Sequence, residues 1–238
     1  MIKAIFFDLD GTLLPMDENK FTMYYFKLLC DKMSNYGFEA NALQSAIWGG
    51  VKAMYKNDGT KTNEEAFFDY FKTIFGEESI KLKPVFEEFY RNEFKQTINC
   101  VGKNPYSREI VDFARNNFSY VILSTNPIFP KVATIERMEF VNLKEDDFDF
   151  ITTYENSSYT KPNPKYFLEL LKKFSLKPEE VVLFGNNTLE DYACATSIGI
   201  KTIMVGENII HSENESKDIE YIYLNELKDR LLSLKDSE

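Results

Sequence analysis

Residues Phe6 to Leu14 read FFDLDGTLL and follow the mostly apolar start of the chain, residues 2–5. A short apolar run that is rich in Ile and Phe and ends at a glycine is typical of a buried strand followed by a turn. Asp8 and Asp10 stand at the end of that strand. Ligands of open α/β sheets bind outside the carboxyl ends of the strands, so the two acids are candidates for an active site. The alternative is a polar turn, since Asp and Gly are common turn residues.

The composition indicates a globular protein that does not bind nucleic acid. The chain has 238 residues, of which 44% are hydrophobic and 28% charged. Its net charge of −10 would repel the phosphates of a nucleic acid. There is no apolar run of 18 residues and no secretory signal pattern, so we expect no membrane association.

The cysteines and the single histidine narrow the possible chemistry. Cys30, Cys100 and Cys194 are odd in number, scattered and without the spacing of a metal site, which predicts buried, reduced thiols in a cytoplasmic protein. His211 is the only histidine, which argues against a zinc site with several His ligands and against a histidine-based catalytic triad. We expect chemistry based on carboxylates, Lys, Ser or Thr, and a hard metal ion.

Residues 16–104 show apolar residues at helical spacing and no convincing strand. Four amphipathic stretches are expected, at about 21–34, 41–55, 62–75 and 85–94. Short connections between amphipathic helices are typical of a helical bundle. We therefore predict a helical domain at 16–104, inserted into a core domain formed by residues 1–15 and 105–238. Trp48 in this block could line a substrate face, but we interpret it as a core residue.

From Pro105 onward, predicted strands and helices alternate. The expected strands after the first are residues 120–123, 148–153, 180–184, 201–205 and 221–223. The expected helices are residues 106–117, 129–139, a segment bearing Phe167 to Phe174, 191–198 and 224–234. Such alternation predicts an α/β core with a doubly wound, Rossmann-like parallel sheet.

Three later strand ends also carry polar groups. Thr125 and Asn126 follow the second strand, Lys161 lies in the loop after the third, and Asn186, Asn187 and Asp191 follow the fourth. Parallel strands bring these ends to one edge of the sheet. This set suits phosphoryl transfer. One carboxylate can accept the phosphoryl group, a second can move protons, and oxygen ligands suit Mg²⁺.

These motifs resemble those of the haloacid dehalogenase-like superfamily. The sequence DLDGT at residues 8–12 resembles its first motif, and Thr125-Asn126 resembles its second. Residues 161–164 (KPNP) resemble the third motif, and Gly185 through Asp191 resemble the fourth. The helical block between the first two motifs is similar in place and type to the C1 cap of that family.

The resemblance implies a role for each matching residue. Asp8 would be the nucleophile and a metal ligand, and Asp10 the general acid/base whose backbone carbonyl also faces the metal. Thr125 and the backbone amide of Asn126 would bind the phosphoryl group, and Lys161 would neutralise it together with Asp8. Asp191 would orient or bind Mg²⁺. Dehalogenases of the family lack the second acid because halide needs no protonation, so Asp10 favours phosphate chemistry.

One departure concerns the metal site. The family usually has an acid directly after the glycine of the fourth motif, where this chain has Asn186 and Asn187. Either amide oxygen fits the spacing to Asp191, so the register is open, and one charge fewer should weaken Mg²⁺ binding.

The sequence predicts a Mg²⁺-dependent phosphatase that hydrolyses a small phosphorylated metabolite through an aspartyl-phosphate. The alternatives are a phosphomutase on the same scaffold and a catalytically weak protein that binds a phosphorylated ligand or a partner. The oligomeric state is left open.

Overall fold

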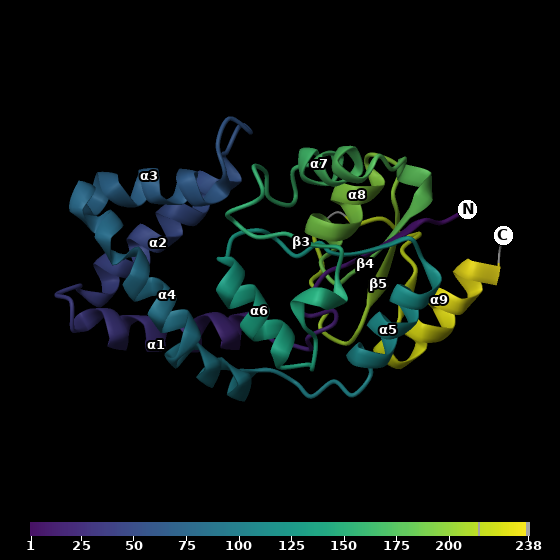
Figure 1. Cartoon of the computed structure of the whole chain (residues 1–238), viewed down its shortest axis with the longest axis horizontal. Helices are drawn as coiled ribbons and strands as arrows, with labels where there is room; N and C mark the ends of the chain where they lie inside the picture. Colours follow the sequence, from purple (N-terminus) through teal and green to yellow (C-terminus); the bar gives the residue numbers. More distant parts are fainter. Residues whose placement is uncertain (214, 237–238) are drawn as a thin grey trace.

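A six-stranded parallel sheet forms the centre of the protein in the computed structural model, which describes residues 1–213 and 215–236 (Figure 1). Its order is β3-β2-β1-β4-β5-β6, which places β1 at the point where the chain reverses its direction of travel across the sheet. The strands are β1 (Ala4–Phe7), β2 (Tyr120–Leu123), β3 (Phe150–Ile151), β4 (Val181–Gly185), β5 (Lys201–Val205) and β6 (Tyr221–Ile222). The predicted α/β fold with a parallel sheet is confirmed.

Helices cover both faces of the sheet because alternate residues of β1 point to opposite sides. Ile5 and Phe7 pack into the cluster that contains α5 (Ser107–Asn117) and α9 (Leu227–Asp236), which lie side by side in Figure 1. Ala4 and Phe6 pack into the cluster that contains α7 (Lys165–Phe174) and the short α8 (Cys194–Thr196). All four β1 side chains are fully buried. The carboxyl end of β1 is therefore held rigidly from both faces.

The segment between β1 and β2 is helical and has its own core. It contains α1 (Glu18–Ser34), α2 (Ala40–Tyr55), α3 (Asn63–Phe75) and α4 (Lys83–Arg91), with 3₁₀ helices η1 (Glu77–Leu82) and η2 (Glu93–Cys100). Helices α1 to α4 gather at one end of the molecule, away from both termini (Figure 1). Their cluster is rich in aromatic rings and is completed by Ala133 of α6 (Lys131–Glu139) from the sheet domain. Thr62 caps α3 through a capping box with Glu65.

Two predicted elements differ from the observed ones. The third strand was expected at 148–153 but is limited to Phe150–Ile151; the Thr152 amide still donates to the Leu123 carbonyl, and a turn follows at residues 154–156. The helix expected from Asp191 begins earlier, with a π-helix, η5 (Thr188–Ala193), that continues into α8. The remaining elements lie within a few residues of their predicted bounds.

No helix in the described part of the chain combines the length and hydrophobicity needed to cross a membrane. The three cysteines are free; Cys194 is buried, whereas Cys30 and Cys100 are only half-buried, contrary to the expectation that all three are core residues.

The aromatic core of the helical block should contribute strongly to stability. Phe71 is fully buried and contacts the rings of Phe67, Phe75 and Phe86, whereas Ile74 on the same helix is 49% exposed. Phe71→Ala should lower the free energy of unfolding by about 3–5 kcal/mol through lost burial and the cavity left behind. Ile74→Ala should change it by only about 0.5 kcal/mol. Urea denaturation followed by circular dichroism measures both; equal effects would contradict the assigned packing.

Candidate active site

Asp8 and Asp10 directly follow β1, in a turn that glycine permits. The Leu9 carbonyl accepts hydrogen bonds from the amides of Thr12 and Leu14, at 3.2 and 2.8 Å. Gly11 has a φ of +79°, and a Cβ there would lie 2.0 Å from the side-chain nitrogen of Asn186. Glycine is therefore required both for the backbone conformation and for the close approach of Asn186. This approach brings the first and fourth motifs into contact.

Lys161 joins Asp8 to Asp191 in a buried ion triad. Its ammonium nitrogen lies 2.9 Å from Oδ1 of Asp8 and 2.5 Å from Oδ1 of Asp191, and its side chain is 1% exposed. Burial acts to lower the pKa of Lys161, but the carboxylates of Asp191 and Asp8 outweigh it and raise the pKa, so the lysine stays charged. Burial raises the pKa of Asp8, as do Asp191 and Asp10, while Lys161 acts in the opposite direction. The lysine thus favours the ionised form of Asp8.

The two asparagines after β4 have different surroundings. The second carboxylate oxygen of Asp191 accepts the backbone amides of Asn186 and Asn187, at 3.1 and 3.0 Å. The side-chain oxygen of Asn187 accepts the amides of Leu189 and Glu190 and so caps η5. Asn186 is buried and donates from its side-chain nitrogen to the Asn208 carbonyl, 2.9 Å away. The side-chain oxygen of Asn186 is therefore more available to a ligand than that of Asn187.

Arg137 is a site residue that the sequence analysis missed. It lies on α6, is 1% exposed, and its guanidinium pairs with the carboxylate of Asp10. The guanidinium also lies 4.5 Å from the ring centroid of Phe129. Burial raises the pKa of Asp10 and Arg137 acts to lower it. Arg137 follows Ala133 by four residues and so lies on the same, buried face of its helix. A charged residue at such a position could have been recognised as a candidate for the site.

Tyr55 was also missed, and its bond with Glu190 connects the helical block to the core. The Tyr55 hydroxyl, at the end of α2, donates to Glu190 at 2.9 Å. The Asn126 side chain donates to Glu190 at 2.9 Å and to the Tyr55 hydroxyl at 3.1 Å. Burial raises the pKa of Glu190. These bonds join three distant segments of the chain beside the site.

Thr125 is fixed by its own backbone. Its carbonyl accepts the hydroxyls of Thr152, at 2.6 Å, and Tyr166, at 3.0 Å, and its side chain is buried at the cavity wall. These bonds fasten the end of β2 to the segment after β3 and to α7.

One cavity of about 240 Å³ lies between the sheet edge and the helical block. All seven residues proposed from the sequence line it: Asp8, Asp10, Thr125, Asn126, Lys161, Asn186 and Asp191. Arg137, Glu190 and Glu18 line it as well, so five carboxylates face two cations. Trp48 also lines it and is 52% exposed, so its assignment to the core is wrong. The reason is that the buried face of α2 carries Leu43, Ala46, Ile47, Gly50 and Met54, and Trp48 lies outside that stripe.

The oxygen atoms at the centre of the cavity suit a hard cation. Within residues 1–213 and 215–236, no three Asp, Glu, His or Cys side chains are arranged to hold a metal ion. In that same part of the chain, Oδ1 of Asp10 is buried without a hydrogen-bond partner. A Mg²⁺ ion needs few protein ligands because it keeps several waters. Asp8, Asp10 and Asn186 supply carboxylate and amide oxygens of the kind that fits it, whereas both oxygens of Asp191 already accept other bonds.

Comparisons with known proteins identify the family of the chain. A family model described as haloacid dehalogenase-like hydrolase matches residues 5–205. A glyceraldehyde 3-phosphate phosphatase of Methanothermobacter thermautotrophicus is 25% identical over 219 residues, which cover 90% of this chain and 90% of that protein.

Two solved structures show the same fold. A HAD phosphatase from Thermococcus onnurineus superposes with a TM-score of 0.63 at 22% identity, covering 97% of this chain and 98% of its own. A 2-haloacid dehalogenase from Pseudomonas syringae also gives 0.63, at 19% identity, covering 98% of this chain and all of its own.

The ion triad generates a pH-dependent prediction. Lys161→Met would leave Asp8 and Asp191 buried without their cation, which should cost about 3–5 kcal/mol at neutral pH. An acid whose pKa is raised in the folded state binds its proton more tightly when folded, so stability falls as pH rises through that pKa. The loss caused by the substitution should therefore be smaller near about pH 5 than near about pH 8. Urea denaturation in metal-free buffer checks this, and a loss that is equal at both pH values would contradict the triad.

Proposed function

Because the chain belongs to the haloacid dehalogenase-like hydrolase family, we propose that it is a Mg²⁺-dependent phosphatase acting on a small phosphorylated metabolite. The observation that carries this proposal is the separation of the two acids after β1. Asp8 is paired with Lys161, whereas Asp10 is paired with Arg137. Two carboxyl groups in one site with different partners are suited to different roles. The name of the Methanothermobacter thermautotrophicus relative supports a small phosphate ester as the substrate class.

In the first step an oxygen of Asp8 attacks phosphorus, and the bond from phosphorus to the leaving alcohol breaks. Asp10 gives its proton to the leaving oxygen, so the alcohol departs neutral. An aspartyl-phosphate then remains on Asp8. Lys161 and Thr125 line the space for the phosphoryl oxygens, and the buried ammonium offsets their negative charge.

In the second step water attacks phosphorus of the aspartyl-phosphate. Asp10 takes the proton of that water, the bond from phosphorus to the Asp8 oxygen breaks, and inorganic phosphate leaves. Mg²⁺, held by Asp8, the carbonyl of Asp10 and Asn186, would reduce the repulsion between the anionic substrate and Asp8. Asp191 holds Lys161 and the backbone of Asn186 and Asn187, and we place it next to the metal rather than directly on it.

Residues 16–104 would act as a cap over the core formed by residues 1–15 and 105–238. The hydrogen bonds of Tyr55 with Glu190 and Asn126 support this role, since they fasten the end of α2 to the core at the edge of the cavity. A closed cap excludes bulk water during the first step. The three free cysteines support the cytoplasm, a reducing compartment, as its location.

Removal of either acid should separate the two roles. Asp8→Asn should reduce turnover of p-nitrophenyl phosphate to background, because an amide cannot form the intermediate. Asp10→Asn should lower kcat by about 10²–10⁴-fold, the usual contribution of a general acid/base. Chelation should abolish the wild-type activity and added Mg²⁺ should restore it.

The comparison that decides the function is wild-type protein against Asp8→Asn, each with and without Mg²⁺. Equal rates would contradict the phosphatase. Retained phosphate binding without turnover would instead favour a binding protein.

Arg137 should act on the rate through Asp10. Arg137→Met removes the partner of Asp10 but no group that we place on the phosphate. We expect kcat to fall by at least about tenfold while KM changes by less than about threefold. Steady-state kinetics measures this split, with a thermal melt to show that the variant is folded. A change confined to KM would contradict the positioning role.

A further inference from the structure

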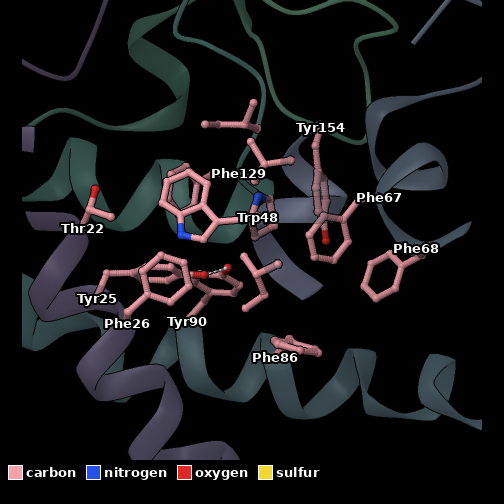
Figure 2. Close-up of a pocket in the computed structure, with 14 residues that line it drawn as sticks. Thr22, Tyr25, Phe26, Trp48, Phe67, Phe68, Phe86, Tyr90, Phe129 and Tyr154 are labelled. Atoms are coloured by element: carbon pink, nitrogen blue, oxygen red, sulfur yellow. Dashed lines mark hydrogen bonds between the residues drawn. The ribbon is translucent and has the colours of Figure 1, made fainter. Parts of the chain in front are cut away.

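A second cavity, of about 110 Å³, opens inside the helical block next to the phosphate site (Figure 2). Nine of its fourteen lining residues are aromatic, and none carries a charge. The rings come from α1, α2, α3 and α4, and from the core residues Phe129 and Tyr154. The cavity is therefore apolar and is built from both domains.

Polar groups inside this cavity are few. The hydroxyls of Tyr25 and Tyr90 hydrogen-bond to each other at 3.0 Å, as the dashed line in Figure 2 marks. Burial raises the pKa of Tyr90 to about 12, so this pair stays neutral. Beyond this pair, the lining side chains offer only the hydroxyls of Thr22 and Tyr154 and the indole nitrogen of Trp48. A sugar placed here would leave several hydroxyls without partners, which costs free energy because each hydroxyl gives up its bonds with water.

The cavity adjoins the phosphate site. Five residues line both spaces: Thr22, Trp48, Val51, Ile128 and Phe129. Phe129 also lies against the guanidinium of Arg137, which holds Asp10. Asp10 is the acid assigned to the leaving oxygen. The alcohol part of a substrate whose phosphorus meets Asp8 would then lie near Asp10 and Phe129, beside the aromatic cavity.

We propose that the substrate is a phosphate monoester whose alcohol part carries a compact apolar group of about the size of one aromatic ring. This assignment rests on the proposed phosphatase function. The volume of about 110 Å³ sets one ring as the upper limit, since an apolar protein cavity that binds benzene measures about 150 Å³. Trp48, half-exposed where the two spaces meet, is placed to stack on the group as it enters.

The test compares two esters with similar leaving alcohols, 2-phenylethyl phosphate and ethyl phosphate. Burial of the phenyl ring should raise kcat/KM by about 10- to 100-fold for the aromatic ester. Glycerol 3-phosphate, of similar size to the ring but polar, should be no better than ethyl phosphate. Measurable but equal rates for the three esters, or a preference for glycerol 3-phosphate, would overturn the proposal.

A variant that fills the aromatic cavity tests whether the preference for 2-phenylethyl phosphate arises there. Ile47 lines the aromatic cavity but not the phosphate site, so Ile47→Phe should lower the preference for 2-phenylethyl phosphate by at least about fivefold. The matched control is Leu168→Phe, which makes the same kind of change at a 46% exposed residue of α7 and should keep the preference. An unchanged preference in folded Ile47→Phe would overturn the proposal.

A binding measurement separates this proposal from the phosphatase function. Trp48 is the single tryptophan of the chain, so its fluorescence reports on the mouth of the cavity. Titration of wild-type protein with 2-phenylethanol should change the Trp48 emission. The Kd from this titration should be at least about tenfold lower than the Kd for 1-propanol. This result is expected even if no phosphate ester is hydrolysed, in which case only the phosphatase function fails. No difference between the two alcohols would overturn the aromatic cavity as a binding site.

Discussion

The buried ammonium of Lys161, held between Asp8 and Asp191, is the interaction on which the site depends. Asp8 follows β1, Lys161 lies in the loop after β3, and Asp191 lies in η5. The two ion pairs therefore join three segments that are distant in sequence and that the sheet brings together. Two buried carboxylates without this cation would repel each other and lose their hydration. Asp191 also accepts hydrogen bonds from the amides of Asn186 and Asn187. These bonds fix the end of β4, where the Asn186 side chain lies close to Gly11.

The second acid has its own cation, and this asymmetry gives the site its chemistry. Asp10 pairs with Arg137 from the buried face of α6 and keeps one oxygen without a partner in the described part of the chain. Arg137 packs in turn on Phe129, which also faces the aromatic cavity. The charged site and the apolar cavity therefore share one wall. A phosphate ester bound there would place its phosphate in the charged site and its uncharged part in the apolar cavity.

The features that could be predicted from the sequence are local ones. The apolar run before Asp8, the glycine turn and the alternation after Pro105 each lie within a few residues, so β1, the parallel sheet and the polar strand ends followed from them. The contacts of Arg137, Tyr55 and Glu190 could not be predicted this way, because they span at least 64 residues of sequence. Trp48 was misassigned because the buried stripe of α2 depends on which face the neighbouring helices cover.

The central claim is that the phosphoryl group is carried by Asp8. The most direct measurement is borohydride reduction of enzyme quenched during turnover, followed by mass spectrometry of the peptide that contains residues 6–14. Reduction of an acyl phosphate converts the aspartate to homoserine, and the account predicts this change at residue 8 only and only when substrate and Mg²⁺ are present. Turnover without any modified residue, or with the change at residue 10, would contradict it.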